Sequence, residues 1–167
     1  MRKKTLYQHE ITEQDREFMR MAIKLADESV KNGGGPFGAI IVKNGEVVAG
    51  RSNSVTINND PTAHAEVNTI REACDKLGTF DLKGCDIYTS CEPCPMCLGA
   101  IYWAHIDRIF YGNTRKDAAR ILFDDDFFYQ ELVKDIHHRQ TPIIPLLRQE
   151  ALHSFRLWTK KTDKTEY

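Results

Sequence analysis

The sequence of 167 residues has no apolar run long enough to span a bilayer, and no hydrophobic signal segment follows the basic residues 1–4. It also lacks internal repeats, linkers and low-complexity tracts. The length suffices for one domain with a real core and is short for two. We therefore expect a single domain over residues 1–167, located in the cytoplasm and bound to no membrane.

The chain has no excess of positive or negative charge, because 23 basic and 24 acidic residues leave a formal net charge of -1. Such a chain offers no broad electrostatic attraction to the phosphates of nucleic acid, so we expect no nucleic-acid partner. A small neutral substrate fits this balance better. Hydrophobic residues make up 41% and charged residues 28%, which is typical of a globular protein and excludes disordered and fibrous chains.

Cysteine is present in an odd number, five, and only Cys94 and Cys97 form a Cys-x-x-Cys pair. A single pair of this kind is more often a redox dithiol or half of a structural zinc site than a catalytic site. No second pair completes a four-cysteine site here. In a reducing cytosol, Cys74, Cys85 and Cys91 are expected to be small buried apolar residues.

Read together with His64 and Glu66, Cys94 and Cys97 match the His-x-Glu and Pro-Cys-x-x-Cys pattern of zinc deaminases. Positions three apart lie on one face of a helix, and Pro95 suits a first helical turn. The positive end of such a helix favours deprotonated sulfur, and a mixed set of sulfur and nitrogen donors suits zinc. We therefore expect one Zn²⁺ per chain, held by His64, Cys94 and Cys97.

Three protein ligands leave the fourth position of a tetrahedral site to water or hydroxide, which is typical of catalytic zinc. Glu66 follows His64 by two residues and lies about 200° round an ideal helix from it, so the two converge only near a helix start. Because Glu66 need not bind the metal, we expect it to carry protons. The alternative from another class is a noncatalytic zinc-stabilised interaction module, which a fourth protein ligand would identify.

Hydrophobic periodicity and turn residues predict alternating helices and strands. Thr12 is expected to cap a first helix that ends at the glycines 33–35, and Asn44-Gly45 is expected to join the strands 37–42 and 47–52 in a hairpin. A helix starting at Asp60-Pro61 would place both His64 and Glu66 in its first turn. Further along, we expect strands at 85–90, 108–112 and 143–147 and helices at 96–104, 116–121, 127–138 and 151–160.

This order predicts an α/β fold, with one three-layer domain built on a central mixed five-stranded sheet that carries helices on both faces. Pro142 and Pro145 limit the strand at 143–147 to an edge of the sheet. In such folds the ligand crevice lies at strand ends beside helix N-termini, where the metal-binding segments are expected.

With these residues placed, the chain resembles the cytidine deaminase superfamily and, within it, the bacterial guanine deaminases. The resemblance runs through the stretches 34–39, 58–66, 88–104 and 123–125, together with Trp158 and the terminal Glu166-Tyr167. It implies hydrolytic deamination of guanine to xanthine and ammonia, with attack of zinc-activated water at C2 of the ring. It also implies a homodimer in which the C-terminal segment, about 150–167, crosses to the partner and closes its pocket.

The same resemblance assigns the other site residues. Glu66 would pass protons to N3 and to the leaving amine with the help of Asp125, which would also contact the substrate. Phe37, Asn53 and Trp103 would form the purine pocket, and Tyr167 would act in trans.

Taken alone, these residues favour plainer interpretations. Asn53 would be a turn residue, Phe37 and Trp103 core aromatics, the acidic run 124–126 a helix cap and Tyr167 a frayed terminus. A guanosine, cytosine or tRNA adenosine deaminase would share the metal residues, so these alternatives remain open.

Overall fold

A mixed sheet of four strands lies at the centre of the residues up to Asp125. The structure is a computed structural model that describes residues 10–167, and the basic residues 1–4 lie outside this range. Along the sheet the strands are β2 (Glu46–Ser52), β1 (Gly38–Lys43), β3 (Cys85–Cys91) and β4 (Arg108–Asn113). β1 pairs antiparallel with β2 and β3, whereas β3 and β4 are parallel, so the predicted mixed sheet is confirmed.

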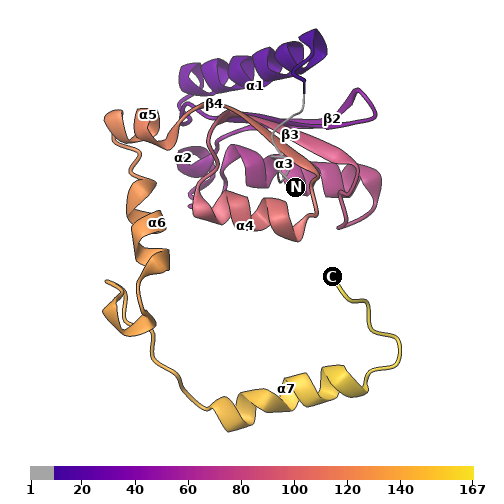
Figure 1. Ribbon diagram of the computed structural model, residues 1–167, viewed down its shortest axis with the longest axis vertical. Helices are drawn as coiled ribbons and strands as arrows, with labels where there is room; N and C mark the ends of the chain where they lie inside the picture. Colours follow the sequence, from indigo (N-terminus) through magenta and orange to yellow (C-terminus); the bar gives the residue numbers. More distant parts are fainter. Residues whose placement is uncertain (1–9) are drawn as a thin grey trace, which may run out of the picture. The chain divides into compact units, whose positions relative to one another are not determined.

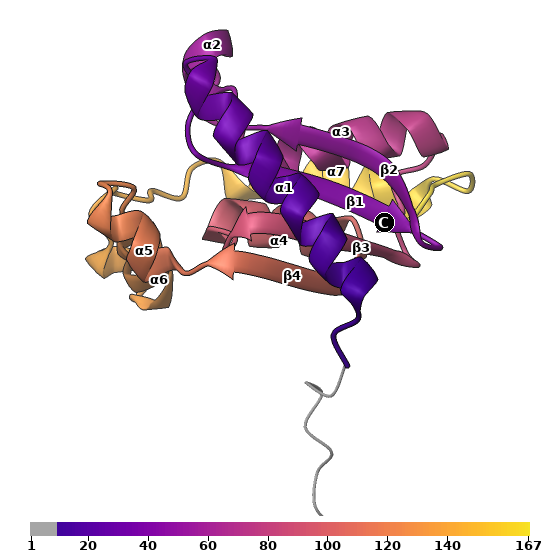
Figure 2. The same cartoon turned by 90° about the horizontal axis from the view of Figure 1, so that it is seen from above.

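Helices cover both faces of this sheet, as Figures 1 and 2 show. On one face α1 (Glu13–Lys31) packs through Phe18 and Ala22 against Ile40 and Tyr88. On the other face α3 (Ala65–Leu77) and α4 (Pro95–Trp103) pack on the alternate residues of the same strands, including Ile41 and Ile87. The alternation follows from the period of two in a strand, which sends successive side chains to opposite faces.

The hairpin and the first helix form as the sequence predicts. Asn44 and Gly45 take φ angles of 52° and 80°, which a two-residue turn between twisted strands requires. Thr12 caps α1, and its hydroxyl and backbone N–H both bond the carboxylate of Asp15. These local signals need no tertiary context, because the turn and the cap satisfy their own backbone groups.

The prediction of a five-stranded sheet is wrong, because the sheet has four strands and residues 143–147 form none. Pro142 and Pro145 lack backbone N–H groups and so cannot donate to a strand ladder. The segment belongs to a second compact unit, Asp126–Tyr167, which contains α6 (Asp126–Val133), the 3-10 turn η1 (Ile136–His138) and α7 (Arg148–Lys160). A single domain over residues 1–167 stays a prediction.

The predicted helix start at Asp60-Pro61 is wrong as well, since α3 begins at Ala65. Asp60 Oδ1 accepts hydrogen bonds from the backbone N–H of Thr62 at 2.8 Å and from its hydroxyl at 2.7 Å, which closes a turn instead of a helix. The chain enters α3 four residues later than predicted. A short helix that was not predicted, α2 (Val55–Asn58), precedes this turn. Another short helix, α5 (Arg115–Arg120), follows β4.

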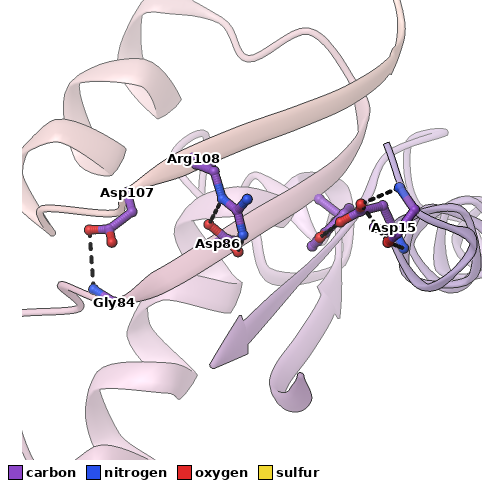
Figure 3. A network of polar contacts seen from close by, with 7 residues as sticks. Asp15, Gly84, Asp86, Asp107 and Arg108 are labelled. Atoms are coloured by element: carbon purple, nitrogen blue, oxygen red, sulfur yellow. Dashed lines mark hydrogen bonds and ion pairs between the residues drawn. The ribbon is translucent and has the colours of Figure 1, made fainter. Parts of the chain in front are cut away.

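Polar contacts tie α1 and β4 to the central strand β3 (Figure 3). The buried Tyr88 hydroxyl donates to Asp15 Oδ1 at 2.6 Å, and the Arg108 guanidinium pairs with Asp86 across the parallel strands at 2.7 Å. Burial, followed by the bond to Asp15, raises the pKa of Tyr88 above its usual range. Among the described residues, no helix is both long and apolar enough to cross a membrane.

Replacing Tyr88 by phenylalanine is expected to lower the free energy of unfolding by about 1–3 kcal/mol, because Asp15 would lose a donor inside the protein. Urea denaturation followed by circular dichroism measures this change. Tyr111→Phe is the matched control, since that ring lies on β4 and is half exposed. An equal loss in both variants would contradict a specific role for the Tyr88 hydroxyl.

Candidate active site

Three donor atoms converge where α3 and α4 begin. His64 is the N-cap of α3, Cys94 is the N-cap of α4, and Cys97 lies in the first turn of α4. His64 Nδ1 lies 3.7 Å from Cys94 Sγ and 3.5 Å from Cys97 Sγ, and all three donor atoms lie within 4.8 Å of one another. Pro95, at the first position of α4, fixes the approach of the chain to this point.

The geometry of these donors fits a zinc ion. Zn–S and Zn–N bonds of about 2.3 and 2.1 Å in a tetrahedron place neighbouring donor atoms about 3.6 Å apart. The two nitrogen–sulfur distances of 3.5 and 3.7 Å match that edge. Two sulfurs and an imidazole are also the donor types that zinc prefers. His64 lies just before α3 instead of in its first turn, but the ligand set predicted from the sequence is brought together.

The ionisation of the sulfurs prepares the site for a cation. The hydrogen bond from Cys97, followed by that from His64, lowers the pKa of Cys94 to about 4. The same bond to Cys94 and burial raise the pKa of Cys97, so the sulfur pair shares one proton. The bond with Cys94 likewise raises the pKa of His64. A divalent cation would displace these protons, since metal binding requires deprotonated ligands.

Glu66 lies in the first turn of α3 and is buried beside the ligand cluster, with 6% of its surface exposed. Its Oε1 accepts a hydrogen bond from the hydroxyl of Thr89 at 3.1 Å, and its Oε2 lies 3.4 Å from the sulfur of Cys97. Burial raises the pKa of Glu66, because it disfavours the charged form. A carboxyl group with a raised pKa, next to a metal-binding cluster, is suited to accept and return a proton.

A cavity of about 430 Å³ opens beside these groups, within the range of small-molecule sites. His64, Glu66 and Cys94 line it, so two of the three clustered ligands and the carboxylate border the same space. Burial, then the charge of Cys94, raises the pKa of Asp125, which lies in the same cavity. The other lining residues are Gly33, Gly34, Gly35, Phe37, Asn53, Val55, Thr56, Cys91, Glu92 and Phe123.

Phe37 and Asn53 are each held in place by a neighbouring residue. The ring of Phe123 meets that of Phe37 edge to face, with centroids 5.0 Å apart. Asn53 Oδ1 accepts from the backbone N–H of Val55 at 3.2 Å, which leaves the amide NH₂ as a donor. A Cβ at Gly34 would lie 2.7 Å from the Asn53 carbonyl oxygen, so only glycine fits this approach.

Two residues that were predicted to contact the substrate, Trp103 and Tyr167, are not among the described residues that line the cavity. Trp103 ends α4 and is 65% exposed. Tyr167 is 73% exposed and belongs to the second unit. Their roles stay predictions.

Other neighbours of the site were missed because their signals are tertiary. Thr89 is an ordinary β-branched residue of a buried strand until its contact with Glu66 is seen. Cys91 was predicted as a buried apolar residue and is buried, but it also lines the cavity. Burial raises its pKa to about 12, so it remains a thiol. Glu92 Oε2 accepts from the backbone N–H of Arg115 at 3.0 Å, which fixes the start of α5.

The comparisons with known proteins agree with this chemistry. The model of the cytidine and deoxycytidylate deaminase zinc-binding region matches residues 12–113. This chain belongs to that deaminase family. A guanine deaminase from Bacillus subtilis is 50% identical over 151 residues, which are 90% of this chain and 97% of the relative.

The crystal structure of that guanine deaminase superimposes with a TM-score of 0.88, covering 91% of this chain and 98% of the other. A tRNA-specific adenosine deaminase from Agrobacterium fabrum is 43% identical over 139 residues, covering 83% of this chain and 90% of the relative. The family therefore includes relatives whose names give different substrates. Differences in the residues that line the cavity must account for the choice of substrate.

Proposed function

We propose that this chain is a zinc-dependent guanine deaminase, which hydrolyses guanine to xanthine and ammonia. The observation that carries the proposal is the cluster of His64, Cys94 and Cys97 beside a cavity that His64, Cys94 and the buried Glu66 line. The 50% identity with a guanine deaminase over nearly the whole chain supports the choice of base.

Zinc held by His64, Cys94 and Cys97 would supply Lewis acidity that lowers the pKa of a water molecule. Glu66 takes one proton from the attacking water and delivers it to N3 of the purine. It then takes the second proton of that oxygen, which is now bonded to C2, and gives it to the leaving amine as the C–N bond breaks. Its raised pKa favours this exchange, because a proton carrier works best with a pKa near the working pH. Asp125, whose pKa is also raised, assists from the same cavity.

The purine would be held by the side chains that face the cavity. Phe37 offers an aromatic surface for stacking, braced by Phe123, and the Asn53 amide donates to an acceptor on the base. Asp125 accepts from a purine N–H. Trp103 is proposed as a further wall of the pocket.

Ammonia release from free guanine, guanosine, cytosine, adenine and a tRNA stem-loop tests this proposal in one experiment. We expect release from guanine above all others, dependent on zinc. Preference for any other member of the panel would overturn the choice of guanine.

Deamination of tRNA adenosine is the alternative that the relatives raise, and the charges of the site argue against it. Three carboxylates, Glu66, Glu92 and Asp125, line the cavity, and its described lining residues include no lysine or arginine. Phosphate contacts dominate the affinity of proteins for RNA, so such a cavity favours an uncharged base.

We further propose a cytoplasmic homodimer in which the C-terminal segment, about 150–167, closes the partner's pocket through Tyr167. The exposure of α7 supports this, because the helix buries none of its residues and leaves Phe155, Leu157 and Trp158 exposed. An apolar helix surface of this kind is typical of an interface between chains.

The exchange of the tail can be tested by complementation. Tyr167→Ala and Glu66→Gln homodimers are each expected to lose activity, the first by about tenfold or more because an open pocket admits water. Co-expression of the two chains should restore activity, since a mixed dimer has one pocket with both Glu66 and a partner's Tyr167. Ammonia release from the purified, differentially tagged mixed dimer is the measurement.

A control mixture of the two separately purified proteins, assayed at once, should show no gain before subunits exchange. No recovery in the mixed dimer would contradict a tail that acts in trans.

A further inference from the structure

Thr89 lies on the central strand β3, on the face that meets α3 and α4, and only 1% of its surface is exposed. It pairs with Ala39 of β1 on one side and with Tyr111 of β4 on the other. A strand paired on both sides is a rigid support, and a β-branched side chain has few rotamers. The hydroxyl of Thr89 is therefore held in place more firmly than a group on a loop.

That hydroxyl donates to Glu66 Oε1 at 3.1 Å, whereas Oε2 lies 3.4 Å from Cys97 Sγ. The two oxygens of the carboxylate thus face different surroundings. Oε1 contacts Thr89 of the sheet, Oε2 contacts Cys97 of the ligand cluster, and Glu66 itself lines the cavity.

Thr89 and Cys97 are the two side chains that donate to the Glu66 carboxylate among the described residues. Cys97 gives up its proton when its sulfur ligates a metal, so that donor is lost in the metal-bound protein. The threonine hydroxyl keeps its proton under the same conditions. It is the side-chain donor that persists while the enzyme works.

We propose that Thr89 is a positioning residue that holds Oε1 of Glu66, so that Oε2 is the oxygen that carries protons during deamination. This inference rests on the proposed function. A carboxylate free to rotate would spend part of its time with neither oxygen aligned to the reacting atoms, which lowers the rate of proton transfer and leaves substrate binding unchanged.

Thr89→Val tests this proposal, because valine has the same shape without the hydroxyl. We expect kcat to fall about tenfold and KM to change by less than about twofold, with zinc content unchanged. Thr89→Ser, which restores the donor, should recover kcat to within about threefold of the wild type. Rates are measured on whichever base of the panel the wild-type chain deaminates, so failure with guanine alone overturns the choice of base and leaves this test intact.

Thr69→Val is the matched control. Thr69 is also a buried threonine, but its hydroxyl donates to the carbonyl oxygens of Ala65 and Ala39 at 2.6 and 3.2 Å and anchors α3 to β1. This variant should lower stability while kcat stays within about twofold of the wild type.

A second control places Thr89→Val in a Glu66→Gln background, where the residual rate should change by less than about twofold. A kcat of Thr89→Val within about twofold of the wild type would overturn the proposal, as would an undiminished loss in the Glu66→Gln background. If the valine variant does not fold, Thr89→Ala also removes the hydroxyl, and the same thresholds apply to it.

Discussion

Replacing Glu66 by glutamine is expected to lower kcat by about a thousandfold or more, which is within the range for removal of a general acid–base group. Glutamine keeps the shape and can still meet the hydroxyl of Thr89, but it cannot take a proton from water or return one to the substrate. The measurement is steady-state ammonia release from guanine. Elemental analysis should find the same zinc content as in the wild type, because Glu66 is not among the three clustered ligands.

The stability of the variant separates a lost proton carrier from a misfolded protein. Burial raises the pKa of Glu66 in the folded state above its unfolded value, so the charged carboxylate costs stability once the pH exceeds the unfolded pKa. At pH 7 the zinc-free Glu66→Gln protein should therefore be at least as stable to urea as zinc-free wild type. A variant that binds zinc and keeps more than about a tenth of the wild-type kcat would refute the role of Glu66.

Removal of a metal ligand is expected to have the second large effect, a loss of both zinc and activity. Cys97→Ala takes away a buried sulfur 3.5 Å from His64 Nδ1 and leaves two donors, which cannot form the site on their own. Zinc content should fall from one per chain to near zero, and ammonia release should disappear with it. Inductively coupled plasma mass spectrometry on dialysed protein measures the metal.

Cys91→Ala is the control for this change, because it removes a buried thiol that lines the neighbouring cavity and is not one of the three clustered donors. It should retain its zinc. Acidification should release the ion from the wild-type protein, since protons return to Cys94, Cys97 and His64 as the pH falls. Zinc retained by Cys97→Ala at full stoichiometry would show that the three donors do not form the site.

The metal residues could be predicted from the sequence because their spacing is itself a local geometry. Cys94 and Cys97 start one helix, and this places their sulfurs on the same side wherever the helix lies. His64 and Glu66 start another helix. The α/β order of the chain was then enough to predict that the two helix N-termini lie close together. The hairpin at Asn44-Gly45 was predictable for the same reason.

Other features could not be predicted from the sequence, because they depend on competition between local structures or on contacts between residues far apart in the chain. Pro61 has a good propensity for a first helical turn, but the side chain of Asp60 captures Thr62 and delays the helix to Ala65. The apolar run at 143–147 resembles a strand, but Pro145 within it and Pro142 just before it lack the N–H groups that a strand ladder needs. The contact of Thr89 with Glu66 joins positions 23 residues apart, and no local pattern marks it.

The protonated sulfur of Cys91 bears on how the enzyme withstands oxidants. Peroxides and alkylating agents attack thiolates, and a thiol whose pKa is about 12 has almost none of that form at neutral pH. Cys91, which lines the catalytic cavity, can therefore survive chemical stress that would modify an ordinary exposed cysteine. Damage should instead begin at Cys94, whose pKa is lowered, once the ion has left.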